Sequence, residues 1–141
     1  LWAYRNADYD RWVARVATTI PPDARVMGDT MFWIGLRNHP FISSIPPYYS
    51  DWRSVDDAVA HICKYRPDYL IQASSLYPGL DGLAPRSKNL RATRFGQACE
   101  TMATRVPCQI LTEFYDRDFG AVRVWKVNWP FPSTTSTNSG G

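Results

Sequence analysis

The stretch that most constrains the fold is ARVMGDTMFWIGL, residues 24–36, which follows the break Pro21-Pro22-Asp23. Its first part is a short apolar run that stops at Gly28-Asp29, and such a run between a proline break and a tight turn indicates a buried strand. Helical patterns lie on both sides, so strands and helices alternate from here. Because ligands of open α/β sheets gather at the carboxyl ends of parallel strands, we expect ligand-binding chemistry first at Asp29 and Thr30.

Three segments carry apolar residues at the spacing of an amphipathic helix, namely residues 8–19, 55–65 and 90–106. Asn6 or Asp8 is placed to cap the first of them. Ser54 and Asp57 resemble a capping box at the start of the second, with Asp in place of the preferred Glu or Gln. Leu90 is predicted to begin the third helix, and a proline ends it.

Five short β-prone runs complete the pattern: residues 25–28, 41–43, 69–72, 108–115 and 121–128. The last two are joined by DRDFG, which predicts a β-hairpin with Gly120 at the position that needs a positive φ. We therefore expect a three-layer, Rossmann-like α/β sandwich with a mixed sheet, in which parallel strands precede a C-terminal antiparallel hairpin. Residues 1–129 form one domain in this interpretation, and the Ser/Thr/Gly-rich residues 130–141 form a disordered tail.

Composition excludes several classes of partner and cofactor. The net charge is only +3 and the basic residues are scattered among acidic ones, which argues against nucleic acid as a partner. The chain has three cysteines without a CxxC pair and only two histidines, so we expect no metal site and no cofactor. The cysteines are predicted to be small core residues, although a bridge between Cys99 and Cys108 remains open.

Catalytic motifs are weak, and no residue is predicted to be catalytic. Asp116 and Asp118 have the spacing of a DxD metal motif, but they fall in the hairpin turn, where Asp is favoured for hydrogen bonds to the backbone. His39 and His61 could act as general bases, yet neither a GxSxG nor an HExxH motif accompanies them. The segment around Asp29 lacks GxGxxG and GxxxxGK[ST], so this residue is interpreted as a helix cap or loop anchor if it binds no ligand.

The proline-rich and aromatic segment IPPYYSDW, residues 45–52, supplies the remaining candidates. Tyr48, Tyr49 and Trp52, together with Asp51, could stack on a sugar ring or rest at a membrane interface, because such rings join an apolar face to a polar tip. The alternative is a loop that folds back over the core. Both readings stay open at this point, since aromatic enrichment is compatible with either.

Four sequence segments occur in an order known from one protein family: PPDARVMGD, FWIGLRNHPFIS, KYRPDYLI and LTEFYDRDFGAVRVWKV. Together they resemble the soluble C-terminal region of polytopic glycosyltransferases similar to the dolichyl-phosphate-mannose protein mannosyltransferase family. The resemblance covers most of residues 8–128. It implies a parent that transfers a sugar from a polyprenyl-phosphate donor at the outer face of a membrane, and the family's catalytic carboxylate lies in an early loop outside this chain.

By this resemblance the chain is a non-catalytic, extracytoplasmic domain cut from a membrane-anchored parent. Its partners would be the membrane domain of the same parent chain, a glycan or protein acceptor and the lipid-linked sugar. The domain would recognise the acceptor or support the membrane part, and it should be inactive alone. A second hypothesis is a free-standing α/β small-molecule-binding or hydrolase domain that uses the loops near Asp29, Tyr48 and residues 73–88.

Overall fold

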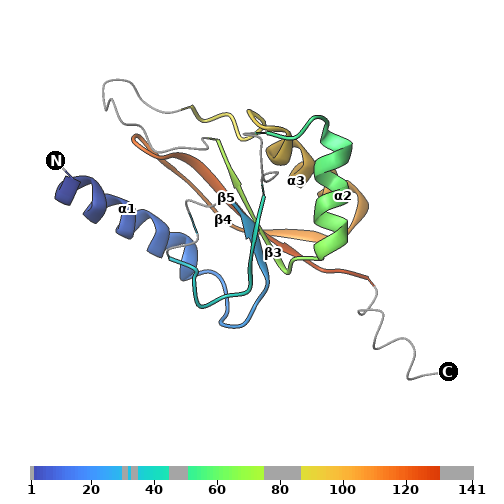
Figure 1. Cartoon of the computed structure of the whole chain (residues 1–141), viewed down its shortest axis with the longest axis horizontal. Helices are drawn as coiled ribbons and strands as arrows, with labels where there is room; N and C mark the ends of the chain where they lie inside the picture. Colours follow the sequence, from blue (N-terminus) through green and yellow to red (C-terminus); the bar gives the residue numbers. More distant parts are fainter. Residues whose placement is uncertain (1, 30–31, 33–34, 45–50, 75–86, 131–141) are drawn as a thin grey trace.

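The computed structural model describes residues 2–29, 32, 35–44, 51–74 and 87–130, and the side chains from Tyr9 onward. Along the chain (Figure 1) the described elements are α1 (Trp2–Ala17), β1 (Val26–Gly28), β2 (Phe41–Ser43), α2 (Val55–Tyr65), β3 (Tyr69–Ala73), α3 (Arg94–Arg105), β4 (Cys108–Asp116) and β5 (Gly120–Val127). Within these ranges no helix is both long and apolar enough to cross a membrane.

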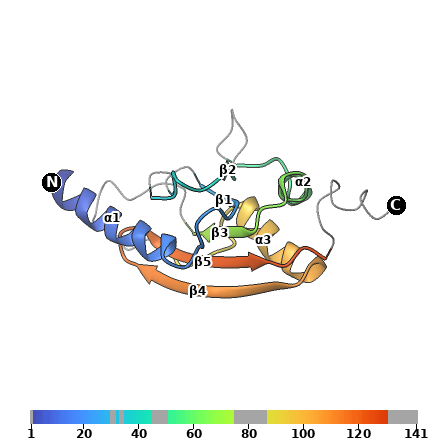
Figure 2. The same ribbon diagram turned by 90° about the horizontal axis from the view of Figure 1, so that it is seen from below.

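The strands form one open, mixed sheet in the order β2-β1-β3-β5-β4 (Figure 2). β1 pairs in parallel with both β2 and β3, whereas β5 pairs antiparallel with β3 and with β4. The prediction of a parallel part followed by a terminal hairpin is therefore confirmed. The hairpin does not extend the sheet in chain order, because β5, the later strand, lies inside and β4 forms the edge.

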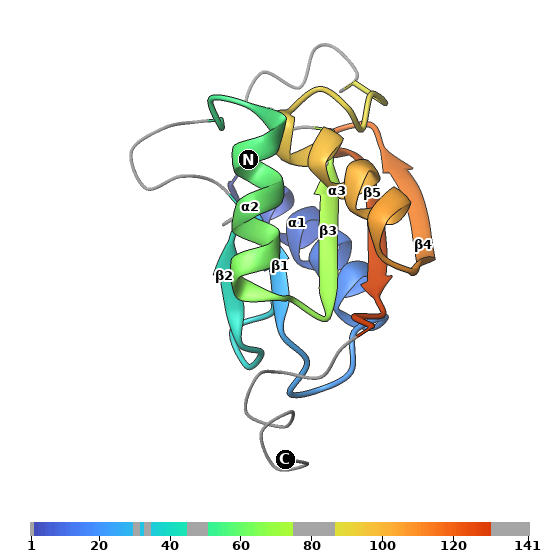
Figure 3. The ribbon, with the colours of Figure 1, turned by 90° about the vertical axis from the view of Figure 1, so that its right-hand side faces the viewer.

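Helices lie on both faces of this sheet: α1 on one, α2 and α3 on the other (Figure 3). The α1 side buries Trp12 and Val16 against sheet residues such as Val124. The indole of Trp12 stacks between the rings of Phe32 and Phe119, with centroids 4.9 and 5.0 Å away. A second cluster lies under α2 and α3, and its buried members are Met27, Ala58, Val59, Ile62, Leu70, Phe95, Ala98, Cys99, Met102, Trp125 and Val127.

Two helix starts differ from the prediction. α1 begins at Trp2, so neither Asn6 nor Asp8 is its cap, and the absence of Gly and Pro from this stretch lets the helix extend further toward the N-terminus. α3 begins at Arg94 and not at Leu90. Thr93 is the N-cap, because its hydroxyl accepts a hydrogen bond from the backbone N–H of Gly96 at 2.9 Å.

The other local predictions hold. α2 spans the predicted residues, and the Ser54 hydroxyl accepts from the backbone N–H of Asp57 at 3.1 Å. In the hairpin the Asp116 carboxylate accepts from the backbone N–H groups of Asp118 and Phe119 at 2.7 and 3.1 Å, which is the predicted turn role. Gly120 has a φ of 89°, as the turn requires. The predicted tail lies almost entirely outside the described residues.

The three cysteines are free thiols. Cys99 is fully buried and Cys108 half-buried, whereas Cys63 is exposed, so the expectation of a core position was wrong for Cys63. Its sulfur nevertheless lies 3.9 Å from that of Met102, at the margin between α2 and α3. Burial raises the pKa of the Cys99 thiol well above its usual range, and it raises the pKa of Cys108 as well.

Candidate functional site

Asp29 lies directly after β1, at the carboxyl end of the parallel strands, but it is only 5% exposed. Its backbone carbonyl accepts a hydrogen bond from the N–H of Phe32 at 3.0 Å, which makes it part of a turn. The pKa of Tyr9 is raised, first by burial and then by the charges of Asp10 and Asp29. Asp29 thus lies close enough to Tyr9 of α1 to affect the pKa of that side chain, and its backbone takes part in a turn.

A pocket of about 400 Å³ opens beside α2 and contains two of the predicted site residues. It is lined by Asp51, Trp52, Arg53, Asp57, Ala60, His61 and Lys64. Asp51 and Trp52 are therefore brought together, while Asp29 does not line this pocket. Thr30, Tyr48 and Tyr49 lie outside the described residues. The volume falls in the range of small-molecule sites in proteins.

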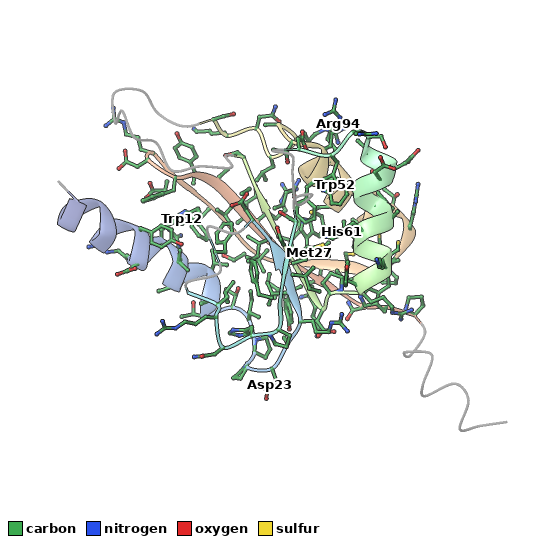
Figure 4. The ribbon with its side chains drawn as sticks, viewed as in Figure 1. Trp12, Asp23, Met27, Trp52, His61 and Arg94 are labelled. Carbon is green, nitrogen blue, oxygen red and sulfur yellow. The ribbon has the colours of Figure 1, made fainter. Side chains whose placement is uncertain are left out.

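Trp52 forms the aromatic wall of the pocket. Its indole N–H donates to the carbonyl of Ser44 at 2.7 Å, just after β2, and this bond fixes the ring against the edge of the sheet. The ring centroid lies 4.7 Å from that of His61, with the two planes tilted by 44°. Figure 4 shows Trp52 between Arg94 and His61 alongside α2. The side chain stays half-exposed, so part of the ring remains available in the pocket.

Asp51 connects the pocket to the start of α3. Its carboxylate accepts from the backbone N–H of Arg94 at 3.2 and 3.3 Å and from that of Trp52 at 2.8 Å. The Arg94 guanidinium lies 3.6 Å from the same carboxylate and donates to the carbonyl of Trp52 at 2.9 Å. A carboxylate is favoured at a helix N-terminus by the helix dipole. Asp51 and Arg94 therefore hold the Trp52 backbone in place.

His61 joins the pocket to β2. Its Nε2 lies 2.8 Å from the carbonyl oxygen of Ser43. A carbonyl can only accept, so Nε2 carries the proton, and in the neutral ring Nδ1 is left as an acceptor. The ring lies between those of Trp52 and Tyr65, the second at 5.0 Å between centroids. The imidazole is thus fixed in position and tautomer.

The sequence patterns did not identify Asp57, His61 and Lys64 as members of one site. They recur at i, i+4 and i+7 on α2, which places them on one face of the helix. That spacing was visible in the sequence. What it could not indicate was that the loop carrying Trp52 packs beside the same face.

The other candidate sites offer fewer side chains that could bind a ligand. A second depression of about 380 Å³ runs along α1 and is lined mainly by small and apolar side chains together with Tyr9, Asp10 and Thr18. Among the described residues, no group of three or more His, Cys, Asp or Glu side chains is placed to hold a metal ion. His39 lies before β2, and neither of its ring nitrogens has a hydrogen-bond partner within the part of the chain that is described.

The pocket beside α2 is therefore the candidate binding site of this chain. Comparison of the sequence with protein-family models and with curated proteins, and of the structure with solved structures, gave no significant match.

Proposed function

We propose that this chain is a non-catalytic, extracytoplasmic C-terminal domain of a membrane glycosyltransferase that uses a polyprenyl-phosphate sugar donor. In this proposal the domain recognises the acceptor or supports the membrane domain of the same parent chain. The observation that carries it is the pocket beside α2, where a fixed indole ring adjoins side chains that donate and accept hydrogen bonds. The resemblance of the four sequence segments to such transferases supports the same conclusion.

We further propose that the fold is a three-layer, Rossmann-like sandwich. The positions of α1 on one face of the sheet and of α2 and α3 on the other support it. In sheets of this kind, binding sites lie at the carboxyl ends of the parallel strands. Ser43 ends β2 and Ser44 follows it. Hydrogen bonds from His61 and Trp52 to the carbonyls of these two residues attach the pocket to the carboxyl end of β2.

The first experiment determines the amino-acid sequence that precedes Leu1 in the parent protein. The proposal expects several apolar segments of about 20 residues, each long enough to span a bilayer. A parent without such segments overturns the proposal and leaves the free-standing binding or hydrolase domain as the better hypothesis.

The second experiment assays the parent in membranes with its lipid-linked donor and its acceptor. If the domain recognises the acceptor, Trp52→Ala raises the KM for the acceptor and leaves that for the donor unchanged. If the domain only supports the membrane part, the variant lowers the amount of folded parent instead. Turnover of the lipid-linked donor by the isolated chain would contradict a non-catalytic role.

A further inference from the structure

The polar wall of the pocket follows two turns of α2. Asp57, Ala60, His61 and Lys64 all line the cavity from this one helix. From Asp57 to Lys64 the helix rises by about 10 Å, at roughly 1.5 Å per residue. Ala60 is exposed and adds only a methyl group, so it projects less far into the pocket than the longer side chains of this face. The wall is therefore a row of polar groups, with the short side chain of Ala60 beside His61.

The polar groups along this row have different hydrogen-bonding capacities. The Asp57 carboxylate only accepts and the Lys64 ammonium only donates. In the neutral ring of His61, Nδ1 is an acceptor, because Nε2–H donates to the Ser43 carbonyl. Both Asp57 and Lys64 are exposed, and neither forms an ion pair with another described residue. A ligand can thus meet two acceptors and one donor in a fixed order.

The aromatic part of the lining is the indole of Trp52, which packs against the His61 ring at 4.7 Å between centroids and is fixed on two sides. Its ring N–H is bound to the Ser44 carbonyl and its backbone is held by Asp51 and Arg94. A fixed aromatic surface binds a flat, weakly polar face without losing side-chain entropy. The N–H is already used, so the ring offers the pocket its apolar surface and not a hydrogen bond.

We propose that this pocket binds a pyranose sugar of a glycan, with Trp52 as the platform. A pyranose has one face of C–H groups, which suits the indole, and a rim of hydroxyls that both donate and accept. Asp57 and His61 accept from hydroxyl groups, and Lys64 donates to one. The length of the polar row suits two linked sugar units lying along α2. This inference goes beyond the proposed function, because it holds whether or not the parent is a membrane protein.

A nucleotide is the main competing ligand, since a base can also stack on an indole. Two features argue against it. The two carboxylates of the lining offset its two cations, Arg53 and Lys64, and a phosphate group beside Asp57 would be repelled. Two of the three polar groups on the row, Asp57 and the neutral His61, also accept hydrogen bonds, which suits hydroxyl groups and not phosphate oxygens.

The experiment records ¹H–¹⁵N NMR spectra of the isolated chain during titration with disaccharides. The probes are cellobiose, maltose, mannobiose and chitobiose, each at millimolar concentration, with adenosine monophosphate as the competing ligand. We expect saturable shifts for at least one disaccharide, centred on the Trp52 indole N–H and on the α2 residues of the pocket. Shifts caused only by the nucleotide, shifts centred elsewhere or no saturable shift for any disaccharide would overturn the proposal.

Paired variants separate binding from folding. Asp57→Asn and Lys64→Gln each remove one charged hydrogen-bonding group from an exposed position, and we expect each to weaken disaccharide binding about tenfold. The matched controls are Asp56→Asn, next to Asp57 in the first turn of α2 but outside the pocket lining, and Lys126→Gln on β5. Both control variants should bind disaccharides as tightly as the unsubstituted chain does. Equal losses in variants and controls would contradict the assignment.

Trp52→Leu should abolish the shifts. Its control is Trp129→Leu, because Trp129 is also half-buried and its indole N–H likewise donates to a carbonyl, that of Pro67 at 2.8 Å. If disaccharides do not bind but the parent proves to be a membrane glycosyltransferase, this inference fails alone. If they bind and the parent has no membrane segments, the proposed function fails alone.

Discussion

At the scale of single residues, the Gln72 side chain in β3 is completely buried, so all of its hydrogen-bond partners must come from the protein. Its amide N–H₂ donates to the carbonyls of Leu90 and Gly96 at 3.1 and 2.8 Å, and its carbonyl accepts from the Trp125 indole at 2.8 Å. The side chain therefore joins the sheet to the start of α3. Such fully satisfied buried groups help to specify one packing arrangement.

Gln72→Leu should lower the free energy of unfolding by about 3 kcal/mol, because it leaves one buried donor and two carbonyls without their partner. Urea denaturation followed by circular dichroism measures the change. Gln109→Leu on the edge strand β4 is the control, since Gln109 is exposed, and it should change stability by less than about 0.5 kcal/mol. Equal effects of the two substitutions would show that the hydrogen bonds of Gln72 contribute nothing.

The Cys99 thiol makes stability depend on alkaline pH. Its pKa is raised in the folded chain by burial, so the folded state holds the proton at pH values where the unfolded state releases it. The contribution is complete below the thiol's unfolded pKa of about 8.5 and is lost as the pH rises toward the folded value. The steepest loss from this one group is about 1.4 kcal/mol per pH unit.

We therefore expect Cys99→Ala to flatten the decline of unfolding free energy above about pH 8.5, measured by urea denaturation at a series of pH values. The exposed Cys63 gives the control, Cys63→Ala, which should leave the slope unchanged. In the folded chain Cys63 should also react with a thiol reagent first. An unchanged slope in the Cys99 variant would assign the alkaline loss to other groups, such as Tyr9, whose pKa is raised too.

At the scale of elements, the start of α3 depends on a close approach at Gly96. A Cβ added there would lie 2.2 Å from the carbonyl oxygen of Leu90 and 3.2 Å from the Thr93 hydroxyl. Replacing glycine by alanine within a helix normally stabilises it by about 1 kcal/mol. Here the clash with backbone should outweigh that gain.

Gly96→Ala should consequently lower the unfolding free energy by more than about 1 kcal/mol, as measured by thermal or urea denaturation. The close approach of Gly96 to Leu90 also keeps the Thr93 cap and the carbonyls bound by Gln72 in place. The loss of unfolding free energy caused by Gly96→Ala should therefore be smaller when Gln72→Leu is already present. A more stable Gly96→Ala variant would mean that the Leu90 segment moves away at little cost.

The elements that the sequence predicted correctly are those whose signals are local. α2 has its Ser54 cap, and the hairpin has Asp116 and the positive φ of Gly120. The start of α3 was misplaced because Leu90 continues the apolar pattern, while its carbonyl is taken by a residue of β3. The same limit applies to the site. Trp52 was predicted from its aromatic surroundings, but its contact with His61 depends on how β2 and α2 pack.

At the scale of the whole molecule, α1 is the one described helix on its face of the sheet. Trp12, Val13, Val16 and Ile20, from α1 and the residues after it, are at most 5% exposed in the core cluster on that side. Each buried side chain of this size contributes roughly 1.5–3 kcal/mol. Their sum is comparable with the whole stability of an ordinary domain, about 5–15 kcal/mol.

A chain lacking residues 1–20 should therefore not fold cooperatively. We expect it to lose its thermal transition and to bind the dye ANS through the exposed sheet face, where Val26 and Val124 would meet water. The full chain, measured alongside, should show one transition and no dye binding. Because the pocket of Trp52 lies over the opposite face, a truncated chain that still unfolded cooperatively would show that α2, α3 and the sheet form a sufficient core by themselves.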